Sequence, residues 1–211
     1  MFFKHRILLI KKHFQNYFIF YFVLVLALIL GIIMGPLIIK KTSYNMKIFL
    51  LKLSHPYFKS HYLREYNNFS VLKASIISNV FLVIVITILG LINPGIFFIP
   101  IFIILKGVFI GYTVAFLVES FGVRGFLTSI IGIYPQNIFI IGGLIGIGAV
   151  AMSICYSIKK PFINRPFLRR NININEYLGI IIIFTLIVIF GSLIEGIISP
   201  KVLKMIVEPF V

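Results

Sequence analysis

The chain has 211 residues, of which 60% are apolar and only 12% are charged, a balance far from that of a soluble domain. Its 20 Lys and Arg residues outnumber five acids and give a net charge of +15, but they lie between apolar segments and form no continuous basic face. This pattern argues against a nucleic-acid partner and favours flanking charges that attract anionic phospholipid. We expect a single membrane domain, 1–211, with an all-α fold.

The first apolar segment, about 17–39, follows four basic residues and is long enough to cross a bilayer as a helix. It ends in Lys40 and Lys41 without the small-residue cleavage motif of a signal peptide, which predicts an uncleaved span.

A hydrophilic loop follows at 40–73, with seven cations and one acid, and it is too small for a catalytic domain. Within it, apolar residues recur at helical spacing between Met46 and Leu53. This spacing is compatible with a short interfacial helix or with an irregular loop, and the two readings stay open.

The next uncharged stretch is too long for one span, and Asn93-Pro94-Gly95 in its middle is typical of a turn. We therefore predict a second span at about 74–92 and a third at about 96–118. The third span carries Lys106, the most informative single residue of the chain.

Residues 125–158 are again uncharged, and one straight helix of this length would measure roughly 50 Å, well beyond a hydrocarbon core of about 30 Å. Pro135 lacks a backbone donor and precedes two amides, Gln136 and Asn137. This predicts a proline-broken half-helix at 126–134 and a fourth span at about 136–158.

A loop with five cations separates the fourth span from a fifth at about 177–198. A cytoplasmic N-terminus places nine flanking cations inside and ten outside, so the total count does not decide the orientation. The compactness of the five-cation loop favours a cytoplasmic N-terminus.

A cation inside a span costs about 2.5 to 3.5 kcal/mol unless it is paired or reaches the interface. We expect Glu119 and Glu195 at the far ends of their spans, a third of a membrane or more from Lys106. Carbonyls freed by Pro135, or the side chains of Gln136 and Asn137, are the predicted partners of Lys106 in an architectural clamp.

Three pairs of glycines spaced four apart lie within the predicted spans, and such pairs let helix backbones approach closely. They are Gly31 with Gly35, Gly107 with Gly111, and Gly142 with Gly146. Tight packing within the chain is the favoured interpretation, and a groove for a partner's helix is the alternative.

The chain lacks the residue groups of hydrolytic enzymes, including any aspartate, and its one cysteine, Cys155, can form no intrachain disulfide. The histidines, His5, His13, His55 and His61, lie in polar flanks and share no ligand spacing with a carboxylate cluster. We expect no enzymatic activity, cofactor or metal site.

The chain resembles the stage II sporulation protein M family over essentially its whole length. The residues that carry the resemblance are Asn93–Gly95, Leu105–Thr113 with Gly122–Gly125, Tyr134–Asn137, and Leu193–Glu195 with Ser199–Pro200.

The resemblance implies a polytopic scaffold of the mother-cell membrane that works with stage II sporulation proteins D and P, which degrade peptidoglycan during forespore engulfment. Relatives also occur in organisms that make no spores. A small transporter or channel that uses Lys106 and the broken helix at Pro135 is the alternative function, and a homo-oligomer stays open.

Overall fold

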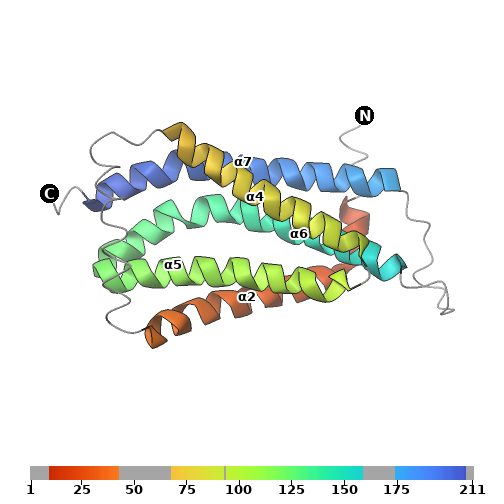
Figure 1. Cartoon of the computed structure of the whole chain (residues 1–211), viewed down its shortest axis with the longest axis horizontal. Helices are drawn as coiled ribbons and strands as arrows, with labels where there is room; N and C mark the ends of the chain where they lie inside the picture. The colour runs from red at the N-terminus through yellow and green to blue at the C-terminus, as the bar shows by residue number, and fades with distance from the viewer. Residues whose placement is uncertain (1–9, 43–67, 93, 159–173, 208–211) are drawn as a thin grey trace.

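The protein, described here from a computed structural model, is a bundle of five long helices (Figure 1). The structure describes residues 10–42, 68–92, 94–158 and 174–207, and no strand occurs in these ranges. The helices are α2 (Phe18–Lys41), α4 (Asn68–Leu91), α5 (Gly95–Gly132), α6 (Tyr134–Ile158) and α7 (Ile174–Val207). Each is long and apolar enough to cross a membrane, which confirms the predicted all-α bundle with five spans.

The helices alternate in direction along the bundle, so that successive connections lie at opposite ends (Figure 1). The end of α2, the start of α4 and the end of α7 share one end, while the turn between α4 and α5 and the end of α6 share the other. The segment that contains the proposed interfacial helix at 46–53 lies outside the described residues.

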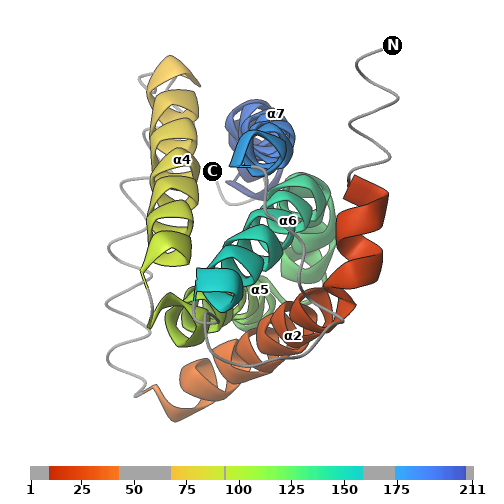
Figure 2. The same cartoon turned by 90° about the vertical axis from the view of Figure 1, so that its right-hand side faces the viewer.

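α6 is the central helix, as the end-on view shows (Figure 2). Its span is 67% buried inside the protein, against 22–33% for the other four, and it contacts each of them. Its glycines and alanines allow this crowding: Gly148 lies against Leu24 of α2 and Gly90 of α4 lies against Ala151. The core around it holds Leu24, Ile86, Ile99, Ile140, Leu144, Ile147 and Val188.

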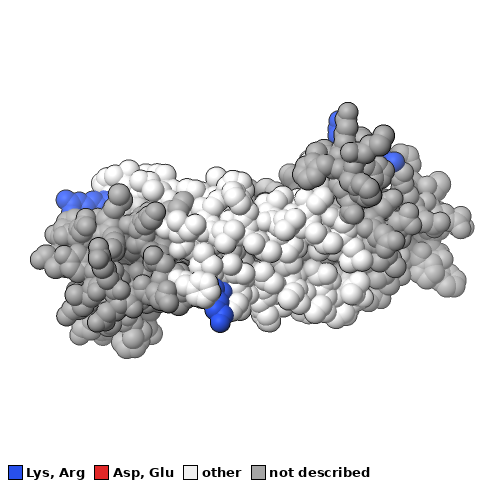
Figure 3. Space-filling view, turned by 90° about the horizontal axis from the view of Figure 1, so that it is seen from above, with Lys and Arg blue, Asp and Glu red and all other residues white. Residues whose placement is uncertain are grey.

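The peripheral helices turn large apolar side chains outward along much of their length. In the space-filling view, the described surface is broad and uncharged, with Lys and Arg only as small separate patches (Figure 3). Such a surface would be a liability in water and is typical of a protein surrounded by lipid.

The predicted half-helix is present, but a glycine sets where it begins. Gly122 has a φ of 56° and a ψ of −133°, a conformation that favours glycine, and it separates the span of α5 from residues 123–132. The reversal is tight, because a Cβ on Gly125 would lie 2.5 Å from the carbonyl carbon of Leu117.

The half-helix and α6 are almost continuous. The Ile133 amide donates to the Ser129 carbonyl at 3.0 Å and the Asn137 amide to the Ile133 carbonyl at 3.4 Å. Pro135 therefore lies in the first turn of α6, a position where the missing donor costs little.

α2 and α5 pack with their backbones in contact through two of the glycine pairs. A Cβ on Gly107 would lie 2.6 Å from the Leu28 carbonyl oxygen and 3.1 Å from the Cα of Gly31. A Cβ on Gly35 would lie 2.6 Å from the carbonyl carbon of Gly111. No side chain can be added at this crossing without separating the two helices.

The third glycine pair is divided between two environments. Gly146 lies against the ring of Phe184 in α7, whereas Gly142 is exposed and a Cβ there would meet nothing within 4 Å.

The helical segment at 10–16 is fixed to the end of the bundle by a buried histidine, His13, which we had expected in a polar flank. His13 is 6% exposed; its Nδ1 lies 3.1 Å from the Tyr21 hydroxyl and its Nε2 lies 3.1 Å from Ser153 Oγ. Ser153 donates its own hydrogen to the Val150 carbonyl at 2.7 Å, so its oxygen accepts from Nε2–H. Nδ1 is then the acceptor for the Tyr21 hydroxyl.

Aromatic rings complete the enclosure of His13. Tyr17, Tyr21 and Tyr177 place their ring centroids 4.8, 5.9 and 5.8 Å from that of the imidazole. Burial lowers the pKa of His13 from 6.5 to about 4.

We predict that Gly111→Leu lowers the thermal stability of the purified protein in detergent, by about 1 to 3 kcal/mol or more, because the new side chain meets the backbone of Ile32. Gly142→Leu is the matched control, since that position is open. Equal melting temperatures for the two variants would contradict this packing.

We also predict that acid destabilises the protein through His13. The unfolded chain binds a proton at this residue below pH 6.5, while the folded chain resists protonation until about pH 4. The free energy of unfolding should therefore fall as pH drops through this window, by on the order of 3 kcal/mol in total. Thermal melts from pH 7 to pH 4 should show a smaller loss for His13→Gln than for the wild type; parallel curves would refute the assignment.

Candidate functional site

A cation and an acid are linked inside the bundle by an amide. Lys106 of α5 donates from Nζ to Asn79 Oδ1 of α4 at 3.1 Å. Asn79 in turn donates from Nδ2 to Glu195 Oε2 of α7 at 3.2 Å and to Ser192 Oγ at 3.0 Å. One amide side chain therefore joins three helices.

Two serines complete this set of residues, which we call the Lys106 network: Ser75, Asn79, Lys106, Ser192 and Glu195. Ser75 Oγ donates to Glu195 Oε2 at 2.5 Å and lies 3.4 Å from Asn79 Nδ2. Ser192 donates to the Val188 carbonyl at 3.0 Å, which leaves its oxygen free to accept from Asn79. The serines thus hold the acid and the amide in fixed orientations.

Helical spacing explains why these side chains converge. Ser75 and Asn79 are four residues apart and share one face of α4, while Ser192 and Glu195 are three apart on α7. The close approach of α4 to α7 at Leu72 and Gly196, where a Cβ on the glycine would lie 2.8 Å from the leucine Cα, brings the two faces together.

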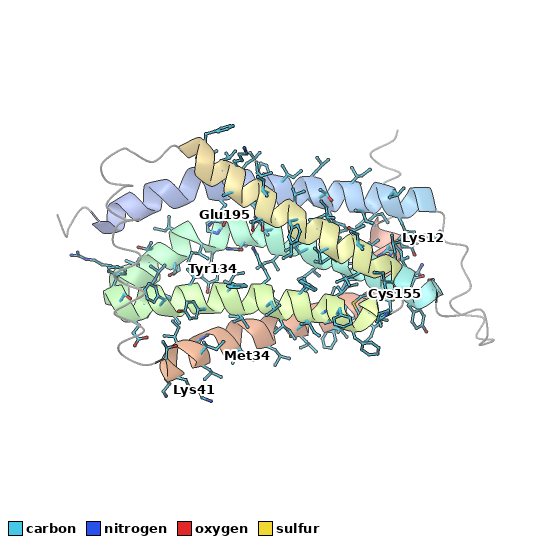
Figure 4. All side chains as sticks on the ribbon, viewed as in Figure 1. Lys12, Met34, Lys41, Tyr134, Cys155 and Glu195 are labelled. Carbon is cyan, nitrogen blue, oxygen red and sulfur yellow. The ribbon has the colours of Figure 1, made fainter. Side chains whose placement is uncertain are left out.

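The expected separation of Glu195 from Lys106 is wrong. α7 continues to Val207, so Glu195 lies well inside the helix, and Figure 4 places it away from the ends of the bundle. Glu195 and Lys106 attract each other electrostatically, with Asn79 between them. Opposite charges joined in this way relieve the cost of a cation within the membrane.

The predicted clamp between Lys106 and the carbonyls near Pro135 is also wrong, because Lys106 donates to Asn79 of α4. The two amides that follow Pro135 bind carbonyls that lie shortly before it in the chain. Gln136 Nε2 donates to the Gly132 carbonyl, and Asn137 Nδ2 donates to the Ile133 carbonyl at 2.8 Å. Each reaches back four residues, as amides in a first helical turn can. Gln136 and Asn137 therefore stabilise the joint of the half-helix and α6.

The turn between α4 and α5 brings together two of the three residues singled out there, while Asn93 lies outside the described residues. Pro94 precedes the first residue of α5, and the Gly95 amide donates to the Ile92 carbonyl at 2.9 Å. A Cβ on Gly95 would lie 2.6 Å from the carbonyl carbon of Leu89. This crowding requires glycine at the turn.

The remaining predicted residues lie on α5 and α7. Gly107 and Gly111 face α2, and Lys106 reaches from the same helix to α4. α5 therefore connects to α2 by backbone contact and to α4 by a charged side chain. Pro200 lies within α7, and Glu119 is exposed near the reversal at Gly122.

Sequence reasoning missed Ser75, Asn79 and Ser192. Asn79 is the one amide side chain in the uncharged run before Asn93. A lone polar side chain within a predicted span indicates a polar contact inside the bundle. Pairing it with Lys106 required the fold, because the sequence does not show which faces of the two helices meet.

The network offers a neutral pair of charges with hydrogen-bonding groups around it. Among the described residues, no group of three or more His, Cys, Asp or Glu side chains could hold a metal ion. The geometry suits helix association or the binding of a polar group.

Comparison with known proteins bears on the resemblance noted from the sequence. No curated protein and no solved structure matches the chain. The family model of stage II sporulation protein M matches residues 20–200, which covers α2, α4, α5, α6 and most of α7. The chain therefore belongs to the stage II sporulation protein M family and is a sporulation-related, multi-pass membrane protein.

Proposed function

We propose that this chain is a non-enzymatic membrane scaffold that recruits and positions peptidoglycan-degrading partners during forespore engulfment. Stage II sporulation proteins D and P are the proposed partners. The proposed site of action is the mother-cell membrane at the engulfing septum, with the N-terminus of the chain in the cytoplasm.

This proposal is supported by the hydrogen bonds that the polar side chains inside the bundle make with one another. Lys106, Asn79 and Glu195 bind one another across three helices, and His13 binds Tyr21 and Ser153 across two. Glycines bring α2 and α5 into backbone contact. These interactions favour a rigid body that presents fixed surfaces to partners.

Anionic phospholipid is a proposed second partner. Lys40 and Lys41 are exposed at the end of α2, and Lys73 is exposed at the start of α4, at the same end of the bundle. Each cation held at a membrane surface contributes roughly 1 kcal/mol of attraction to anionic lipid.

A small transporter is the second candidate, because a charged network lies inside the bundle and a half-helix precedes α6. Transporters use such broken helices to line substrate sites near the middle of the membrane. Against this, two carbonyls near the break, those of Gly132 and Ile133, are bound by the side chains of Gln136 and Asn137.

The first test separates these two functions through Lys106. We predict that Lys106→Met costs about 1 to 3 kcal/mol of stability in detergent, because it leaves Asn79 Oδ1 and Glu195 without a cation, and that recovery of partners falls with it. Lys12→Met, at an exposed cation, is the control. A transporter predicts normal stability with loss of solute flux, and that result would favour the alternative.

The second test addresses the scaffold directly. We predict that the tagged protein, purified from sporulating cells, co-purifies with peptidoglycan-degrading proteins, and that the chain alone releases no fragments from purified peptidoglycan. Gly111→Leu should lose the partners, whereas Gly142→Leu should retain them. Cleavage of glycan or peptide by the isolated chain would overturn a non-enzymatic role.

A further inference from the structure

The charged ends of the Lys106 network lie at its outer edge. Asn79 is 3% exposed and Ser192 is fully buried, whereas Lys106, Glu195 and Ser75 are partly exposed. Asn79 and Ser192 therefore form the inner part of the network, and Lys106, Glu195 and Ser75 lie nearer its surface.

Both charged groups retain hydrogen-bonding capacity. An ammonium group has three hydrogens to donate, and Lys106 gives one to Asn79. The hydrogen bonds that the described residues make to Glu195 both go to Oε2, so Oε1 can accept from a further donor. A donor and an acceptor are thus available on the same network.

Lys106 and Asn79 lie within the apolar parts of their helices, away from the turn that joins them. Asn79 and Lys106 are each about 13 residues from the turn that joins α4 to α5, which corresponds to roughly 20 Å along either helix. From that turn the two helices diverge, and Lys106 bridges them (Figure 1). A side chain on another transmembrane helix can reach Lys106 and Asn79 at this position.

We propose that the Lys106 network binds a transmembrane helix of another protein through an amide side chain, Asn or Gln, near the middle of that helix. A neutral amide can donate to Glu195 Oε1 and accept from Lys106 Nζ at once, and it leaves the net charge of the network unchanged. This inference deepens the proposed scaffold function and rests on it, because it gives the chemistry by which a partner is held.

The test uses the full purified chain in phospholipid vesicles and a probe of defined chemistry. The probe is a fluorescent polyleucine transmembrane peptide with one central asparagine, and its matched control carries leucine at that position. Binding is measured by energy transfer at low peptide density, where the peptides alone do not pair. We expect the asparagine peptide to bind about five-fold more tightly than the leucine peptide.

Variants assign that preference to the network. The preference should disappear in Lys106→Met and shrink in Glu195→Gln, and it should persist in Glu119→Gln, which alters an exposed acid elsewhere. Moving the asparagine to the end of the peptide should abolish the preference of the wild type, a result that needs no variant to fold.

Equal binding of the central-asparagine and leucine peptides by the wild type would overturn the proposal. So would an asparagine preference that survives in a folded Lys106→Met protein, or self-association of the labelled chain through Lys106, which would make a second copy the occupant. The assay contains no peptidoglycan-degrading protein, so a failure here is distinguishable from a failure of the co-purification.

Discussion

A hydrogen-bonding group inside a membrane has no water to bind, and this constraint organises the whole bundle. Lys106 could not remain alone within α5, and its bond to Asn79 fixes α5 against α4. Asn79 extends that link to Glu195 in α7. The arrangement of three helices thus depends on one amide that connects a cation to an acid.

α2 and α5 are held together in a different way, by close packing of their backbones where glycines leave no side chain between them. At Gly31, Gly35, Gly107 and Gly111 the two backbones touch, so attraction comes from close packing and not from polar groups. Lys106 and Gly107 are adjacent in α5 but contact different helices. Lys106 binds α4 through its charged side chain, whereas Gly107 packs against the backbone of α2. A substitution at either position therefore affects the packing of several helices, because α5 contacts both α2 and α4.

The five membrane-spanning helices were predictable, because apolar runs of membrane-spanning length are a strong local signal. Their ends were less so: α4 begins at Asn68 and α7 extends to Val207, beyond the expected spans. The polar contacts were not predictable. Pro135 predicted free carbonyls as partners of Lys106, but Lys106 binds Asn79 of a neighbouring helix, a contact that spacing along α5 does not show. The charge of Glu195 predicted the end of a span at the membrane interface, whereas α7 continues beyond it. His13 looked like part of a basic flank, and only the fold shows the aromatic rings that enclose it.

The central place of α6 has a consequence for how the protein is made. Synthesis proceeds from the N-terminus, so α2, α4 and α5 enter the membrane before the helix that they surround. α6 must then insert between helices that are already in the membrane. The half-helix that precedes it is joined to it almost continuously, so the reversal at Gly122 directs the chain back toward them. Only α7 arrives later, and with it come Ser192 and Glu195; until then Lys106 has Asn79 but no acid. The charged network is therefore completed only when α7, the last of the five described helices, has been inserted, so its formation marks the assembly of these five helices.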